Sequence, residues 1–273
     1  MQRKYLHWSD DELSYLKENY GFVKQDELVS KLRGRKYSAI VKKAQVLGVT
    51  HKEFACKKSN LQILLEDNPT SYYWIGFLLA DGSFTDRRIQ LGVATLDLSH
   101  LQCFLSYVGS TNSICSVSKN YHRVTMANVS VVRQLCDKFG ISSRKTYEPC
   151  QIQELPQDDF LFSLIIGFID GDGSVTSIKH TKKCHRLSVV GHFSWLENFT
   201  FMKRFLHRHL GIDDNVSNAY SRTTNVKLPQ NTFKTKHQLA SFYIDRSSTL
   251  IKIKNCADML MLPYLQRKLG KIS

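Results

Sequence analysis

The sequence lacks the cysteine pattern of a disulfide scaffold or a zinc site. Its seven cysteines are odd in number, and no two stand in a C-x-x-C spacing, which favours a reducing, intracellular compartment. The chain also lacks an apolar run of about 20 residues, the length that a membrane-spanning helix needs, and a recognisable signal peptide. These absences argue against secreted disulfide-rich, zinc-binding and membrane proteins, and they do not distinguish cytoplasm, nucleus and organelle.

Acidic residues are scarce relative to basic ones, with 24 Asp and Glu against 38 Lys and Arg and a net charge of +14. Residues 1–60 hold 13 basic and 7 acidic residues, so the excess is spread along the chain. If the protein neutralised about ten phosphates, the logarithm of its affinity for nucleic acid would fall with the logarithm of salt concentration at a slope of about −9. A basic surface alone serves a membrane or another polyanion equally well.

Two short segments repeat one another: WIGFLLADG at Trp74–Gly82 and IIGFIDGDG at Ile165–Gly173. Each predicts a buried helix too short to cross a membrane. Their aspartates, Asp81 and Asp172, lie 91 residues apart at the expected helix C-termini, where the helix dipole disfavours a negative charge. One Asp-Gly is most simply a turn, but a local rule broken twice at equivalent places indicates function.

Small residues recur at a spacing of four within each repeated segment, which puts each pair on one helical face. Such a face lets two helix backbones approach closely. The following glycines, Gly82 and Gly173, predict left-handed caps that end both helices. The small residues expected to pack the two helices are Gly76, Ala80, Gly167 and Gly171.

Similar sequences follow both segments. Ile89, Leu91 and Val93 alternate with other residues at the period of a strand, and the residues from Leu98 to Val108 follow helical spacing. Each half therefore predicts a helix, two strands, a helix, two strands and a final helix.

From about Ser71 to the C-terminus the chain resembles the single-chain, two-repeat LAGLIDADG homing endonucleases. The resemblance implies an α+β fold in residues 70–273, with αββαββα repeats at about 70–149 and 157–273. The two repeats would form a pseudo-twofold saddle of two antiparallel four-stranded sheets that grips the major groove. It further implies a monomer bound to a long, specific double-stranded DNA site. The family's earlier motif acid is Asp170 in the second copy but Leu79 in the first.

The resemblance also implies the site residues. It places a divalent metal, Mg²⁺ or Mn²⁺, on Asp81 and Asp172 with the preceding residues Ala80 and Gly171. Two carboxylates about 4 Å apart repel by about 4 kcal/mol at an effective dielectric of about 20, and a cation between them removes that repulsion. Lys145 and Lys268 are the basic residues expected to assist catalysis; the alternative is that both are phosphate contacts or solvated lysines.

Residues 1–50 predict a separate three-helix domain. Ser9 and Glu12 have the spacing of a capping box, and further helices are expected near Gln25–Leu32 and Tyr37–Leu47. The pattern resembles a Myb-like helix-turn-helix whose third helix reads DNA; the alternative is a three-helix cap with a solvated basic face. Its expected DNA-binding residues are Arg33, Arg35, Lys36, Lys42 and Lys43. Residues 51–69 are interpreted as a linker.

Further basic and amide side chains lie in or beside the expected strands, where they could reach bases in the major groove or contact phosphates. They are Arg87, Arg88, Gln90, Arg123, Lys182, Arg186, Lys227, Lys234 and Lys236. The sequence thus predicts a homing endonuclease of a mobile intron or intein that hydrolyses both DNA strands and leaves short 3′ overhangs. The alternative is a cleavage-deficient relative that acts as an intron RNA maturase or a transcriptional regulator.

Overall fold

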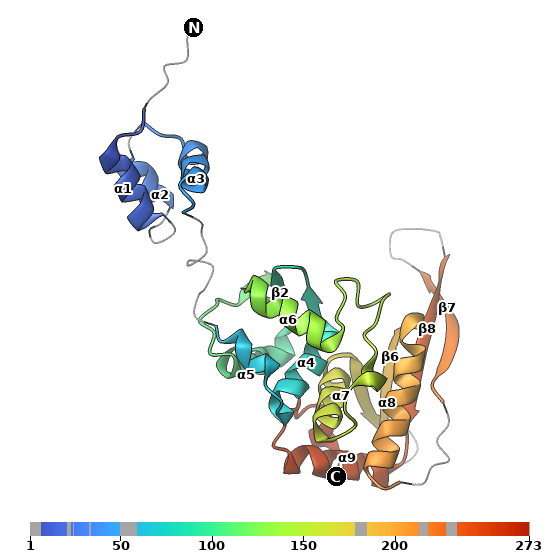
Figure 1. Cartoon of the computed structure of the whole chain (residues 1–273). Coiled ribbons are helices and arrows are strands. Elements are labelled where there is room, and N and C mark those ends of the chain that lie inside the picture. The colour runs from blue at the N-terminus through green and yellow to red at the C-terminus, as the bar shows by residue number, and fades with distance from the viewer. Residues whose placement is uncertain are drawn as a thin grey trace. The chain divides into compact units, whose positions relative to one another are not determined.

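Two separate hydrophobic cores divide the chain into two units, Met1–Lys57 and Lys58–Ser273. The computed structural model (Figure 1) describes residues 7–20, 23, 25–32, 34–49, 59–177, 185–212, 218–227 and 234–272, with the backbone alone at 224–227 and 234–237. None of its described helices combines the length and apolarity needed to cross a membrane.

The first unit contains three short helices. Ser9 and Glu12 form the predicted capping box at the start of the first one. Leu16, Leu28 and Ile40 bring one buried side chain from each helix into a common core. The helices are α1 (Asp10–Asn19), α2 (Gln25–Lys31) and α3 (Tyr37–Val46).

The second unit contains two αββαββα repeats, as the sequence predicts, and belongs to the α+β class. The first comprises α4 (Pro69–Asp81), β1 (Gly82–Phe84), β2 (Arg88–Ala94), α5 (Leu98–Tyr107), β3 (Cys115–Ser118), β4 (Tyr121–Ala127) and α6 (Val129–Phe139). The second comprises α7 (Asp159–Asp172), β5 (Gly173–Ser177), β6 (His185–His192), α8 (Leu196–His209), β7 (Tyr220–Lys227), β8 (Lys234–Ile244) and α9 (Ser247–Met259). Short 3-10 helices are η2 (Leu61–Leu65), η3 (Thr95–Asp97), η4 (Ile152–Glu154), η5 (Phe193–Trp195) and η6 (Leu269–Lys271).

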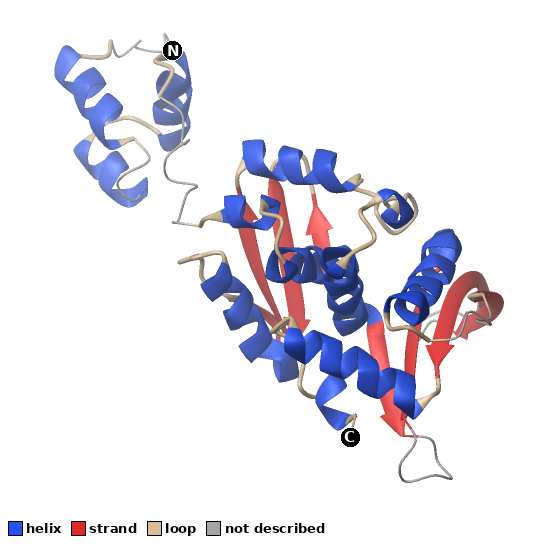
Figure 2. Cartoon of the chain, turned by 60° about the horizontal axis from the view of Figure 1, so that its bottom comes forward, coloured by secondary structure: helices blue, strands red, loops and turns tan. Residues whose placement is uncertain are grey.

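Each repeat forms one antiparallel four-stranded sheet, in the orders β1-β2-β4-β3 and β5-β6-β8-β7. Figure 2 shows the two sets of strands on either side of helices in the second unit. Along β2, Ile89 and Leu91 are fully buried and face Met126 and Val124 of β4. Because side chains alternate along a strand, the residues between them lie on the opposite face. The same alternation occurs in β6, where Leu187 and Val189 are fully buried and Arg186 and Ser188 lie on the other face. Each repeat thus presents one sheet face away from the core.

Helices α4 and α7 lie side by side (Figure 1) and pack directly against each other. Their closest approach is at glycines. A Cβ added at Gly76 would lie 1.8 Å from the Leu164 carbonyl oxygen, and one at Gly167 would lie 1.9 Å from the Tyr73 carbonyl oxygen. These two contacts relate equivalent positions of the repeats, so the helix pair has a pseudo-twofold axis. Only glycine permits the backbones to come this close.

The predicted left-handed caps at Gly82 and Gly173 are wrong. Both glycines are extended, with φ of −81° and −83°, because each helix runs straight into the first strand of its sheet. Glycine is required there for space, since a Cβ would lie 2.4 Å from the carbonyl oxygen of Leu78 or Ile169.

The segment interpreted as a linker, 51–69, includes η2. Leu61 and Leu64 of this 3-10 helix are fully buried in the core of the second unit. The Asn60 N–H donates to the Val108 carbonyl at 2.7 Å. Residues from Asn60 onward therefore belong to the packed structure of the second unit.

Candidate active site

Asp81 and Asp172 end the paired helices α4 and α7, and the helix pair brings them together. A Cβ added at Gly171 would lie 2.3 Å from the Ala80 Cβ and 3.5 Å from the Asp81 Cγ. The two helix ends therefore meet at the small residues that precede the acids. Both aspartate side chains reach solvent at this point.

The surroundings of the two acids disfavour their charged forms. Protein atoms crowd the Asp81 carboxyl and, together with the nearby Asp172, raise its pKa to about 6. Burial also raises the pKa of Asp172, opposed by Lys145 and Lys268. A pair of acids with raised pKa values in one place is typical of a functional site, and a bound cation would relieve the repulsion.

Both predicted lysines lie at this site and cap the ends of the motif helices. The Lys145 ammonium donates to the Leu79 and Ala80 carbonyls at 2.6 and 2.9 Å. The Lys268 ammonium donates to the Asp170 carbonyl and, at 3.0 Å, to the Gly171 carbonyl. Cations here satisfy carbonyls that have no intrahelical partner and counter the unfavourable dipole at the two acids. No sequence signal linked these lysines to the helix ends, because 65 or more residues separate the partners.

The lysines also connect the two repeats electrostatically. Burial lowers the pKa of Lys145, and the acid that opposes this most is Asp172 of the other repeat. Burial likewise lowers the pKa of Lys268, opposed by Asp170 and then by Asp81 of the other repeat. Both lysines lower the pKa of both motif acids, and for each acid the lysine of the opposite repeat has the larger effect.

The donor chemistry fits a hard divalent cation. Among the described residues no group of three or more His, Cys, Asp or Glu side chains gathers as a metal cluster. Two carboxylates with room for water and phosphate oxygens match the preference of Mg²⁺ or Mn²⁺. The carbonyls of Ala80 and Gly171 already accept from the lysines, and their role in metal binding stays a prediction.

A cavity of about 220 Å³ lies beside Asp172 and Lys145. His192, at the end of β6, lines it and bonds through Nδ1 to the Ser194 hydroxyl at 2.9 Å. Sequence reasoning missed His192, since an isolated histidine in a strand pattern carries no signal. The cavity gives solvent-sized groups access to one side of the acid pair.

Three of the expected DNA-binding residues share the polar face of the first sheet. The register places Arg88, Gln90 and Arg123 on the face opposite the buried Ile89 and Leu91. The Gln90 side chain donates to the Thr125 hydroxyl at 3.1 Å. The register thus identifies the face of β2 and β4 on which these side chains lie.

The remaining strand-associated residues lie in less uniform surroundings. Arg87 stands in the turn before β2 and pairs with Asp86 at 3.2 Å, both largely exposed. Arg186 lies at the polar face of the second sheet, where it pairs with Asp245 and stacks over the Tyr243 ring at 4.9 Å. In the backbone register of β7 and β8, Lys227 is the partner of Lys234, and Lys236 is the partner of Asn225. Lys182 and Arg33 lie outside the described residues.

In the first unit, the Arg35 side chain is only 8% exposed and contacts other residues of the same unit. Its guanidinium pairs with Glu12 at 2.8 Å and lies 4.2 Å from the centre of the Trp8 ring. Its expected role in DNA binding stays a prediction. Lys36 and Lys42 are exposed and Lys43 is half-buried. These three lysines remain candidates for a phosphate-binding face.

Comparisons with known proteins give structural likenesses only. No model of a protein family matches the chain, and no curated protein matches it. Among solved structures it is similar to the LAGLIDADG meganuclease I-CpaMI bound to uncleaved DNA, with 14% identity, 74% of this chain and 88% of that chain covered, and a TM-score of 0.47. The LAGLIDADG homing endonuclease I-SmaMI bound to cleaved DNA is similar at 13% identity, with 76% and 87% covered and a TM-score of 0.45. I-GzeII in complex with a DNA target is similar at 14% identity, with 74% and 87% covered and a TM-score of 0.45.

Proposed function

We propose that the chain is a site-specific endonuclease that hydrolyses both strands of double-stranded DNA with a divalent metal. The observation that carries this proposal is the convergence of Asp81 and Asp172 at the ends of α4 and α7, between two lysines. This arrangement lies in the second unit, which has two four-stranded sheets. The whole chain carries a net charge of +14. The sequence resemblance of the two repeated segments supports it as well.

The two carboxylates would hold Mg²⁺ or Mn²⁺, with Ala80 and Gly171 beside them. When bound, the metal supplies an activated water and charge stabilisation for in-line phosphodiester hydrolysis. Asp81 and Asp172 fix where that chemistry occurs. Because their pKa values are raised in the metal-free protein, the acids hold protons to a higher pH, and cation binding would displace these protons.

Lys145 and Lys268 would act on the reacting phosphates. Each ammonium is held by helix-end carbonyls near the two acids, so it would place positive charge where negative charge grows in the transition state. One acid with its cross-repeat lysine would serve each DNA strand. Two such halves would produce a double-strand break, for which we propose short 3′ overhangs.

The polar sheet faces would grip the DNA. Arg88, Gln90 and Arg123 on one face and Arg186 on the other can reach base edges or phosphates. The first unit would add a helix-turn-helix contact through Lys36, Lys42 and Lys43. We propose that one copy of the chain suffices, since both halves of the site lie in one chain.

The test is a cleavage screen on a DNA library that includes the uninterrupted insertion site of the protein's own gene, with and without Mg²⁺. The proposal predicts Mg²⁺-dependent cuts at one locus, with the double variant Asp81→Asn, Asp172→Asn as the inactive control. Specific DNA retention without cutting by the unmodified protein would contradict the nuclease proposal and favour a regulator. Absence of both would favour binding of intron RNA.

A further inference from the structure

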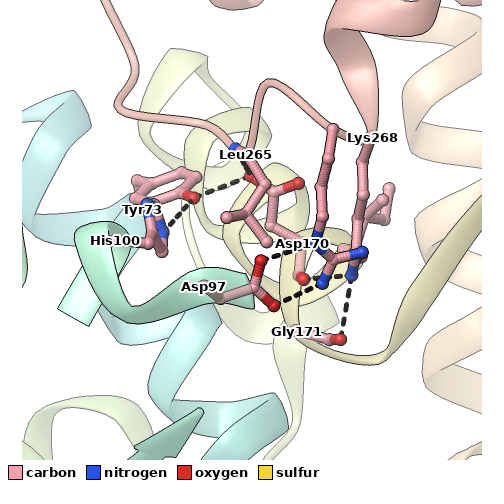
Figure 3. A network of polar contacts seen from close by, with 9 residues as sticks. Tyr73, Asp97, His100, Asp170, Gly171, Leu265 and Lys268 are labelled. Atoms are coloured by element: carbon pink, nitrogen blue, oxygen red, sulfur yellow. Dashed lines mark hydrogen bonds and ion pairs between the residues drawn. The ribbon is translucent and has the colours of Figure 1, made fainter. Parts of the chain in front are cut away.

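Beside the two candidate metal ligands, α7 buries a third acid, Asp170, which is 1% exposed. The equivalent position of α4 is Leu79, so this acid has no counterpart in the first repeat. One Asp170 carboxylate oxygen accepts from the Tyr73 hydroxyl at 2.7 Å and from the Leu265 N–H at 2.9 Å (Figure 3). A carboxylate in the core is expensive to bury, and here it is used to hold a backbone amide near the chain end.

Leu265 begins the turn that leads to Lys268. The Lys268 N–H donates to the Leu265 carbonyl at 2.8 Å, so the amide held by Asp170 and the lysine belong to one hydrogen-bonded turn. The Lys268 ammonium then returns to the Asp170 and Gly171 carbonyls. Both ends of the segment Leu265–Lys268 are therefore fastened to the last turn of α7 (Figure 3).

The same segment is also fastened to the first repeat. Arg267 forms a two-bond ion pair with Asp97 at the end of η3, and Asp97 is only 7% exposed. The Tyr73 hydroxyl that contacts Asp170 is also 2.9 Å from the His100 Nε2. Two buried acids, one from each repeat, thus hold the segment at Leu265 and at Arg267, directly before Lys268.

The segment that carries Lys145 is held differently. Arg144 pairs with Glu148 at 3.2 Å, and both side chains are more than half exposed. The Ser194 hydroxyl donates to the Thr146 carbonyl at 2.6 Å. Within the part of the chain that the structure describes, no hydrogen bond joins a buried carboxylate to residues 143–147. The turns that carry the two lysines are therefore held by different kinds of contact, with buried carboxylates only at the turn of Lys268 among the described residues.

We propose that Asp170 and Asp97 are positioning residues for Lys268, which they keep beside Asp81 by fixing the segment Leu265–Lys268. The proposal rests on the proposed endonuclease function and adds an asymmetry to it. One half of the active site depends on this buried support and the other does not. Loss of the support therefore slows one DNA strand selectively.

The test compares Asp170→Leu, which places the residue of the first repeat at this position, with Asp170→Asn, which keeps an acceptor for Tyr73 and Leu265. Single-turnover cleavage is measured on a target whose two strands carry different labels, alongside DNA affinity. Asp170→Leu should slow cleavage of one strand by about tenfold or more, the same strand whose cleavage Lys268→Met slows, with unchanged DNA affinity. Asp170→Asn should cleave both strands like the unsubstituted protein. Equal slowing of both strands, or equal loss in Asp170→Asn and Asp170→Leu, overturns the proposal.

Hydrogen exchange gives a second readout that needs no cleavage. Peptides covering 262–269 should exchange faster in Asp170→Leu than in the unsubstituted protein and Asp170→Asn, while peptides of α4 stay protected. Unchanged exchange at 262–269 overturns the positioning role even if cleavage is lost. If the unsubstituted protein does not cleave, the nuclease proposal fails and exchange still decides whether Asp170 holds the segment.

Asp97→Ala supports the same decision if Asp170→Leu does not fold. This substitution lies outside the helix pair and removes the ion-pair partner of Arg267. It should raise exchange at 262–269 and slow the Lys268-dependent strand. Normal exchange and equal cleavage of both strands in a folded Asp97→Ala protein would contradict the proposal.

Discussion

At the scale of single residues, the main feature of the site is that two negatively charged side chains lie at helix C-termini. Asp81 and Asp172 stand at helix C-termini, where negative charge is unfavourable. Lys145 and Lys268 offset this effect, because their ammonium groups donate hydrogen bonds to carbonyls at the same helix ends. The acids keep raised pKa values all the same, so the metal-free protein retains an electrostatic strain that a divalent cation would relieve.

The raised pKa of Asp81 predicts a specific pH dependence of stability. The pKa in the folded state, about 6, exceeds the ordinary value of 3.8. The folded state therefore binds more protons between these values, and this carboxyl destabilises the metal-free fold increasingly as pH rises through that window. Asp81→Asn should raise the melting temperature at about pH 7.5 without metal, and the gain should shrink toward about pH 5. Scanning calorimetry in chelator checks this, and a gain that is larger at low pH would contradict it.

At the scale of secondary-structure elements, α4 and α7 form the frame of the second unit. Their contact depends on Gly76 and Gly167, where an added Cβ would enter the backbone of the opposite helix. The site acids are one turn or so further along, so the spacing of the helices sets the spacing of the acids. Any change that separates the helices is expected to affect both stability and catalysis.

Gly76→Ala should destabilise the second unit by about 3 kcal/mol or prevent its folding, since the clash is with backbone atoms that cannot rotate away. Urea unfolding measures this. The matched control is Ser106→Ala on the exposed face of α5, expected to stay within about 0.5 kcal/mol. A Gly76→Ala protein as stable as the control would show that the helices do not pack as closely as described.

The order of elements in the second unit could be predicted from the sequence because local periodicity carries it: alternation at Ile89 and Leu91, helical spacing after Leu98. Contacts between distant segments could not. Nothing local shows that Arg35 turns inward to Glu12, 23 residues away, or that Asp170 holds Leu265, 95 residues away. The wrong cap at Gly82 has a related cause, since an Asp-Gly end looks the same whether the chain turns or continues as a strand.

At the scale of the whole molecule, the chain combines two units with separate cores and a shared excess of positive charge. The first unit holds 12 of the 38 Lys and Arg residues. The second holds both acids and both lysines of the candidate site. This division predicts that binding strength and cleavage chemistry can be separated experimentally.

Deletion of residues 1–57 should weaken DNA affinity by about tenfold or more at physiological salt and flatten its salt dependence, because fewer phosphates are neutralised. The protected footprint should shorten, while cleavage at saturating protein persists. Footprinting and salt titration check this. An unchanged footprint with unchanged affinity would show that the first unit is a three-helix cap without a DNA-binding role.

The proposed active site is tested most directly by strand-resolved cleavage of a supercoiled plasmid target in Mg²⁺, with Asp81→Asn, Asp172→Asn and the double variant. The unsubstituted protein should yield linear DNA. Each single variant should slow one strand by about 100-fold or more, so that nicked circles accumulate, with opposite strands spared in the two variants. The double variant should leave the plasmid intact. Linearisation by either single variant at the unsubstituted rate, or any cutting by the double variant, would contradict a shared site built from these two acids.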